Sequence, residues 1–260
     1  MSMRVTVLGG AAAWPNAGQG CSAYLVQSGA QSILIDCGSG AVQELRKHVD
    51  YTAIDAILIS HFHSDHVLDL VAYRYGLLYG VRQKSRQIPV WLPPGGLERM
   101  RMLGDAFDGQ GERYDTFWDA AFDLREYDPE SPLELGSITM TFAPTQHFIE
   151  CYAMRLEHST GRVVAYSADT GAIEGLVELF TGADLGIIEA TLEAHGETPL
   201  EWRGHLTPED AGRLAALARV DRLVLTHLWQ ERSEDAVVAG ARTEFDRDIR
   251  IATPGLILRV

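Results

Sequence analysis

Short apolar runs alternate with amphipathic segments along the whole chain. Runs rich in Val, Ile and Leu predict strands near residues 3–8, 22–26, 32–36, 56–60, 89–92, 137–143, 151–157, 163–167, 185–189, 222–226 and 249–258. Apolar side chains at helical spacing predict helices near residues 39–49, 67–80, 95–107, 173–181, 208–218 and 233–246. Strands and helices are mixed in both halves, which suits an α/β protein built as a four-layer αββα sandwich. No linker rich in Pro, Gly and Ser divides the chain, so we expect a single domain over residues 1–260.

The most informative segment is His61-x-His63-x-Asp65-His66, which directly follows the apolar run at 56–59. Imidazoles beside a carboxylate suit Zn, Mn or Fe and favour a hydrolytic divalent centre over a thiolate-bound structural one. In an extended segment the first three of these side chains point to one side, and a turn after them can redirect the fourth. One ion cannot easily take four side chains from so short a stretch. The motif therefore predicts two neighbouring ions, and a solvated polar loop is the alternative.

Three later polar residues each follow a predicted strand. They are His147, Asp169 and His227. Ligands collect beyond the carboxyl ends of strands in layered α/β proteins. Taken singly, each residue would be interpreted as part of a surface loop. Together with the histidine-rich motif they become candidate ligands.

The order and spacing of these motifs, beginning at Asp36 in Leu34-Ile35-Asp36-Cys37-Gly38, resemble the metallo-β-lactamase superfamily. The resemblance implies two zinc ions per chain, with manganese or iron as alternatives. It also implies that Asp36 supports the site, whereas capping of the loop before the next helix is its structural alternative. The implied ligands are His61, His63 and His147 for one ion, Asp65, His66 and His227 for the other, and Asp169 as the bridge.

Two further segments resemble the ribonuclease Z-like phosphodiesterase branch of that superfamily. They are Ile188-Glu189-Ala190-Thr191 and Gly204-His205-Leu206-Thr207. The resemblance implies that His205 donates a proton to the leaving oxygen and that Glu189 orients it. A histidine paired with a carboxylate can protonate a poor alkoxide leaving group near neutral pH. In the corresponding mechanism Asp65 orients or deprotonates the nucleophile while it binds metal.

Both assignments have structural alternatives. His205 precedes Thr207-Pro208, an N-cap followed by a proline at the first helical position, and could simply support that helix start. Glu189 could be an ordinary polar residue at a strand end.

The sequence departs from typical ribonuclease Z between the third and fourth metal motifs. The commoner form of that enzyme carries a long arm there that grips tRNA, but the interval from 147 to 169 has room for only two strands and a turn. Ser64 also stands where a glycine is usual, and Val67-Leu68 replaces a Gly-Leu pair. The chain is more similar to arm-less bacterial metal-dependent hydrolases of the same branch.

Charge bears on the substrate. The formal net charge is −14, and Lys47 and Lys84 are the only lysines. The nearest approach to a basic cluster is Arg82-Gln83-Lys84-Ser85-Arg86, which is typical of a solvated turn. Long-range repulsion therefore disfavours a long nucleic acid, although metal ions supply local positive charge that a phosphodiester needs.

Cysteine usage and hydropathy favour a cytoplasmic protein. Cys21, Cys37 and Cys151 are widely spaced and odd in number, which predicts buried thiols in a reducing compartment. The N-terminus resembles a first strand rather than a signal peptide, and no apolar run reaches membrane-spanning length. Residues 104–134, rich in Asp, Glu and Gly with scattered aromatic residues, predict a surface excursion with an amphipathic packing face. A lid or a homodimer contact is the alternative.

The main functional hypothesis is a dinuclear zinc phosphodiesterase for a small or short phosphodiester. Three alternatives stay open on the sequence. They are a ribonuclease Z-type tRNA 3′ endonuclease, a lactone or carboxylic ester hydrolase at the same metal site, and a non-catalytic metal-binding regulatory protein.

Overall fold

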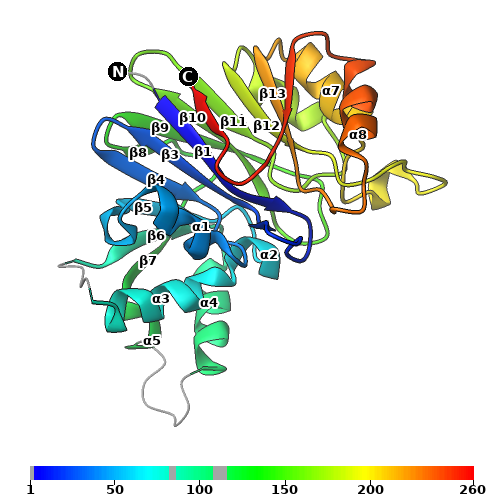
Figure 1. Cartoon of the computed structure of the whole chain (residues 1–260). Coiled ribbons are helices and arrows are strands. Elements are labelled where there is room, and N and C mark those ends of the chain that lie inside the picture. The colour runs from blue at the N-terminus through cyan, green and yellow to red at the C-terminus, as the bar shows by residue number, and fades with distance from the viewer. Residues whose placement is uncertain (1–2, 82–85, 108–115) are drawn as a thin grey trace.

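The computed structural model describes residues 3–81, 86–107 and 116–260 as two sheets packed face to face with helices on both outer faces (Figure 1). The first sheet has the order β15-β1-β3-β4-β5-β6-β7, and β2 pairs with β1. Its strands are β1 (Met3–Ala11), β2 (Gly20–Cys21), β3 (Ala23–Ser28), β4 (Gln31–Ile35), β5 (Ala56–Leu58), β6 (Ile88–Leu92), β7 (Phe122–Glu126) and β15 (Ile257–Arg259).

The second sheet has the order β14-β13-β12-β11-β10-β9-β8. Its strands from β11 to β14 are parallel, whereas β8, β9 and β10 form an antiparallel meander. The strands are β8 (Leu133–Leu135), β9 (Ile138–Pro144), β10 (Tyr152–His158), β11 (Val163–Tyr166), β12 (Leu185–Glu189), β13 (Arg222–Thr226) and β14 (Asp248–Ile251).

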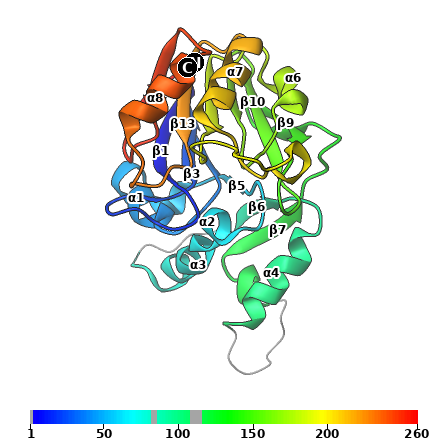
Figure 2. The ribbon, with the colours of Figure 1, turned by 90° about the vertical axis from the view of Figure 1, so that its right-hand side faces the viewer.

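The helices cover the outer face of each sheet (Figure 2). Helices α1, α3, α4 and α5 share a buried apolar cluster with the first sheet, and α6, α7 and α8 share another with the second. The α-helices are α1 (Ala41–His48), α2 (Ser64–Val67), α3 (Asp69–Tyr79), α4 (Gly96–Asp105), α5 (Thr116–Asp119), α6 (Val177–Phe180), α7 (Pro208–Leu217) and α8 (Glu234–Arg242). Short 3-10 turns lie at Tyr51–Ala53, Glu174–Leu176 and Leu200–Trp202.

Strand periodicity explains why the sheets are buried on both faces. In β4, Ile33 and Ile35 pack into the core between the sheets, whereas Leu34 packs against the outer helices. Successive side chains of a strand point to opposite faces, so a strand covered on both sides is apolar throughout. The four-layer αββα sandwich expected from the sequence is thereby confirmed.

Element boundaries differ from the expectations at the chain's C-terminal end. The strand expected at 249–258 is two strands, β14 and β15, which belong to different sheets. Between them the chain turns at Thr253 to Gly255, where Gly255 has a φ of 82°. Apolar content alone did not reveal the turn, and the helix expected at 233–246 ends at Arg242.

The segment 104–134 has the amphipathic packing face expected for it in its described part, but it also contains a strand that the sequence did not predict. Phe117, Trp118 and Phe122 are buried in the core between the first sheet and its helices. The segment also supplies β7, which pairs with β6 as an edge strand. Phe117, Trp118 and Phe122 are therefore core residues. Residues 108–115 lie outside the described ranges, and so do positions 82–85 of the basic cluster.

The parallel strands bring their carboxyl ends to one edge of the sandwich. Strands β4 and β5 of the first sheet and β11, β12 and β13 of the second all run in register with parallel neighbours. The candidate site occupies this edge, which is where ligands gather in layered α/β proteins. Within the described ranges, no helix is both long and apolar enough to traverse a bilayer.

Candidate metal centre

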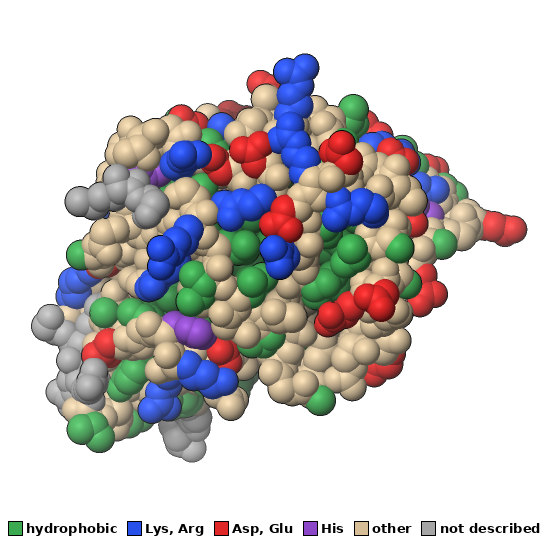
Figure 3. Space-filling model, turned by 45° about the horizontal axis from the view of Figure 1, so that its top comes forward, with side chains coloured by type: hydrophobic (Ala, Val, Ile, Leu, Met, Phe, Trp, Pro, Cys, Tyr) green, Lys and Arg blue, Asp and Glu red, His purple; other side chains and the backbone are tan. Residues whose placement is uncertain are grey.

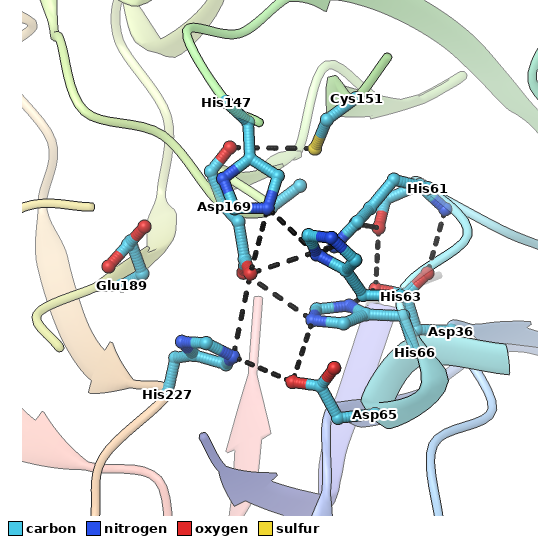
Figure 4. Close-up of polar contacts among 12 residues, drawn as sticks. Asp36, His61, His63, Asp65, His66, His147, Cys151, Asp169, Glu189 and His227 are labelled. Atoms are coloured by element: carbon cyan, nitrogen blue, oxygen red, sulfur yellow. Dashed lines mark hydrogen bonds and ion pairs between the residues drawn. The ribbon is translucent and has the colours of Figure 1, made fainter. Parts of the chain in front are cut away.

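Each candidate ligand lies just beyond the end of a strand. The segment His61 to His66 follows β5, and His147, Asp169 and His227 follow β9, β11 and β13. Figure 4 shows these side chains converging on Asp169 from separate segments of the chain. The structure thus brings together all seven ligands that the resemblance implies.

A first group of ligand atoms comprises three histidine nitrogens and one oxygen of Asp169. His63 Nδ1 lies 3.2 Å from His61 Nε2 and 2.9 Å from His147 Nε2. Asp169 Oδ2 lies 3.6 Å from His61 Nε2 and 3.7 Å from His147 Nε2. Tetrahedral zinc sites have ligand atoms about 3.4 Å apart, given zinc–nitrogen bonds of about 2.1 Å. The four atoms therefore fit one tetrahedral divalent ion.

A second group shares Asp169 with the first. His66 Nε2 lies 3.5 Å from Asp65 Oδ2 and 3.4 Å from Asp169 Oδ1. His227 Nε2 lies 3.0 Å from Asp65 Oδ2 and 3.5 Å from Asp169 Oδ2. Because one carboxylate faces both groups, Asp169 has the position of a bridging ligand.

The extended geometry expected from His61 to Asp65 is wrong beyond His63. His63 is the N-cap of α2, and Asp65 and His66 lie on that short helix. The helical turn directs Asp65 toward His66 and His227 instead of toward His61 and His63. The alternation of side chains in an extended strand therefore does not describe the whole motif. The change from extended chain to helix separates its four side chains into two groups.

Two unpartnered atoms test whether these residues fit metal ions. His66 Nε2 and Asp169 Oδ1 are buried and have no hydrogen-bond partner among the described residues. Buried polar atoms are normally satisfied, and such exceptions need an explanation. Both atoms belong to the second group of ligands and lie 3.4 Å apart, so a divalent cation bound there would satisfy them.

The electrostatics of the centre favour neutral imidazole ligands in the first group and an ionised bridge. Burial lowers the pKa values of His61, His63 and His147. Burial acts to raise the pKa of Asp169, but nearby His227 and His66 outweigh it and hold that pKa well below its usual range. Neutral imidazole and ionised carboxylate are the forms that bind metals.

Hydrogen bonds orient most of the ligating rings. His66 Nδ1 lies 2.8 Å from Asp36 Oδ2, which also accepts from Ser60 Oγ and Tyr166 OH. His147 Nδ1 donates to the carbonyl of Gly204 at 2.8 Å. These bonds fix the tautomers that leave each Nε2 free for a metal. Asp36 therefore supports the site rather than capping the loop, as the resemblance implies.

The pair Glu189 and His205 lies beside the second group. His205 Nδ1 is 3.0 Å from Glu189 Oε1, and its ring stacks on that of His227 with centroids 5.4 Å apart. Burial acts to lower the pKa of His205, but Glu189 outweighs it and raises that pKa to about 9. Nearby divalent ions would lower it again. The His205 side chain keeps about 20 % of its surface exposed, so it is accessible from solvent.

Glu189 has more partners than a single histidine. It is fully buried and accepts hydrogen bonds from the backbone of Thr170 and Leu206 and from the hydroxyl of Thr191. The same hydroxyl lies 2.7 Å from His227 Nδ1. Glu189 therefore joins three loops and, through Thr191, also orients a ligand. Sequence reasoning missed this role because backbone donors leave no sequence signal.

Backbone strain gathers at the centre. Asp36, Ala168 and His227 have φ values of 56°, 49° and 59°, in the left-handed region that residues other than glycine seldom adopt. Asp36 contacts the candidate ligand His66, Ala168 directly precedes Asp169, and His227 is itself a candidate ligand. Such strain persists where the surrounding structure fixes the chain, and it is typical of functional sites.

The cysteines do not enter either group of ligands. Cys21, Cys37 and Cys151 are buried free thiols, as expected, and burial raises the pKa of each. Cys151 donates from Sγ to the backbone carbonyl of Asp169 at 3.4 Å. Cys151 therefore contributes to packing beside Asp169, the candidate bridging ligand.

The family model described as "Beta-lactamase superfamily domain" matches residues 31–228, which include every candidate ligand. The chain belongs to this superfamily. A probable metallo-hydrolase, YhfI of Bacillus subtilis, is 31 % identical over 98 % of this chain and 99 % of its own length. Its crystal structure, titled a metallo-beta-lactamase fold protein, covers both chains fully with a TM-score of 0.87 and 29 % identity.

More distant relatives of this superfamily include ribonucleases. Ribonuclease Z of Haloferax volcanii is 26 % identical, covering 100 % of this chain and 96 % of its own. Human tRNase Z, short form, has the same fold, with a TM-score of 0.74, 24 % identity and 98 % coverage of both chains. Together with the two groups of ligands, these relationships make the chain a metal-dependent hydrolase of the β-lactamase superfamily, related to ribonuclease Z.

A first prediction concerns Asp36. Asp36→Asn should weaken divalent-metal binding about 10–100-fold, the usual effect of losing a partner that orients a ligand. The amide would turn a donor toward groups that already donate to Asp36, so His66 would lose its fixed orientation. Chelator competition measures the affinity, and thermal unfolding checks the fold. Asp128→Asn, in an exposed turn, is the control, and unchanged affinity in Asp36→Asn would contradict the assignment.

Proposed function

We propose that this protein hydrolyses small or flexible phosphodiesters at a pair of divalent ions, with zinc as the preferred metal. The observation that carries the proposal is the Glu189–His205 pair beside the double group of ligands. A proton donor is needed most where the leaving group is a poor alkoxide, as in a phosphodiester. The relationship to enzymes named ribonuclease Z supports the same chemistry.

The residues of the site would have distinct roles in phosphodiester hydrolysis. Two divalent ions held by the two groups of ligands would supply a hydrolytic nucleophile near neutral pH and would neutralise charge on the phosphoryl oxygens. Asp65, which accepts a hydrogen bond from the backbone of Ala13 at 2.9 Å, would orient the nucleophile. His205 would donate its Nε2 proton to the leaving oxygen, because Glu189 already holds Nδ1.

The proposed restriction to small substrates rests on shape and charge. Strands β10 and β11 form a short hairpin between His147 and Asp169, as the sequence interval predicts, and leave no room there for an arm. The match to the Haloferax enzyme extends over 307 positions against 260 residues here, so that enzyme has segments this chain lacks. Basic side chains are interspersed with acidic ones on the face in Figure 3, and the net charge is −14.

The substrate prediction can be tested with protein loaded separately with zinc and with manganese. We expect turnover of bis-p-nitrophenyl phosphate and dinucleoside monophosphates, and poor processing of a tRNA precursor, because the net charge of −14 opposes binding of a long polyanion. Lactones are included as a second class of substrate. Efficient, position-specific removal of a tRNA 3′ trailer at physiological salt would contradict the size restriction. Lactone turnover without any phosphodiester turnover would contradict the proposed chemistry.

A further inference from the structure

An aromatic side chain stands exposed at the edge of the metal centre. Phe148 directly follows the candidate ligand His147 and keeps 66 % of its surface exposed. Phenylalanine is usually buried, but single exposed apolar side chains are common on protein surfaces. An exposed ring is therefore informative only when its neighbours are functional groups. Here the surroundings are a candidate ligand and the proposed proton donor.

The ring of Phe148 contacts both of those histidines. Its centroid lies 5.1 Å from that of His147 and 5.9 Å from that of His205, both within the range of aromatic pairs. The ring also lies close against Gly204, where a Cβ atom would come within 2.4 Å of two of its carbons. Glycine at 204 therefore allows the ring to pack on the loop that carries His205.

The negative net charge of the protein favours recognition of an anionic substrate through an uncharged contact. The protein carries a net charge of −14, so its overall field opposes an anionic substrate. Bound metal ions can hold the phosphoryl group, but they do not distinguish one phosphate ester from another. Stacking of a planar ring adds affinity without requiring a basic side chain.

We propose that Phe148 is a specificity-determining residue that stacks on a planar ring, such as a nucleobase, attached to the phosphoryl group bound at the metal centre. This inference rests on the proposed phosphodiesterase function and names its substrate class. The ring is carried by the residue next to a ligand, so a base separated from the phosphorus by a sugar can reach it. Phe148 thereby favours nucleotide-like phosphodiesters over simple alkyl ones.

A second aromatic group provides an internal comparison. Trp14 is 53 % exposed and stacks on Trp229 with centroids 5.7 Å apart. It follows Ala13, which donates to Asp65. Trp14 therefore lies near the second group of ligands, whereas Phe148 contacts the first group and His205. Substitution of each residue separately shows which ring a base contacts.

The test measures equilibrium binding to metal-loaded protein, so that it does not depend on turnover. Adenosine 5′-monophosphate is compared with ribose 5-phosphate, which has the same sugar phosphate without the base. We expect the base to tighten binding by about 10-fold in the wild type, the usual contribution of one stacked base. Phe148→Ala should remove this preference without weakening ribose 5-phosphate binding, and Phe148→Tyr should retain it. Tyr79→Ala, which removes another exposed ring far along α3, should change neither affinity.

The outcomes separate this inference from the proposed function. A wild-type protein without base preference, or an unchanged preference in Phe148→Ala, would overturn the assignment of Phe148. Loss of the preference in Trp14→Ala but not in Phe148→Ala would overturn it as well. If the base preference depends on Phe148 but no phosphodiester is hydrolysed, the stacking site stands and the proposed function fails. If phosphodiesters are hydrolysed without base preference, the function stands and the stacking site fails.

Discussion

Asp169→Ala is expected to remove most of the bound metal and to lower hydrolytic activity by at least about 10³-fold. Asp169 Oδ2 lies 3.5–3.7 Å from the Nε2 atoms of three histidines, which are His61, His147 and His227. The other oxygen, Oδ1, lies 3.4 Å from His66 Nε2. Its removal therefore takes a ligand from both groups at once. Loss of the Lewis acid costs several kcal/mol of transition-state stabilisation, and each 1.4 kcal/mol is about tenfold in rate.

Metal analysis of the purified variant measures the first effect, and turnover of bis-p-nitrophenyl phosphate measures the second. The wild type should hold about two ions per chain, as expected for a paired centre. Asp128→Ala, which removes a carboxylate from an exposed turn, should keep both the metal and the activity. Circular dichroism shows whether Asp169→Ala is folded. Full metal occupancy with wild-type turnover in a folded Asp169→Ala protein would exclude a bridging role.

The candidate ligands could be located from local signals, whereas their division between two ions came from the family resemblance. Each of His147, Asp169 and His227 lies within three positions of the end of an apolar strand, and the parallel arrangement of β11 and β13 brings two of these strand ends together. The layered fold was predictable for the same reason, since alternating strands and helices must cover both faces of a sheet.

Asp36 and Glu189 were expected from the family resemblance, but the partners that hold the ligand rings and Asp36 were not predictable, because their roles depend on contacts distant in the sequence. Tyr166 donates to Asp36 across 130 positions, and the carbonyl of Gly204 accepts from His147 across 57. Neither a backbone carbonyl nor a tyrosine in a strand produces a sequence pattern that identifies it as such a hydrogen-bond partner. Strand β7 was missed for a related reason, since the acidic residues around it concealed a short strand at Phe122–Glu126.

His205→Ala is expected to lower turnover of an alkyl phosphodiester about 10²–10⁴-fold while both metals stay bound. That range is the usual contribution of a positioned general acid. The residue belongs to neither of the two groups around Asp169, so metal content should not change. The loss should be much smaller for p-nitrophenyl esters, because p-nitrophenolate leaves without protonation. A matched series of esters with leaving groups of rising pKa measures the difference.

Glu189→Gln completes this test, because it separates orientation of His205 from proton donation. The amide keeps one acceptor oxygen but turns its NH2 group toward the backbone amide of either Thr170 or Leu206, which now donate to different oxygens of Glu189. We therefore expect lower thermal stability together with a milder dependence on leaving group. His48→Ala, at the end of α1, is a histidine control that should behave as wild type. A uniform loss across all leaving groups in His205→Ala, or loss of metal, would make His205 a structural residue. The proton donor would then have to come from elsewhere, and the main observation that favours a phosphodiester over other substrates would be lost.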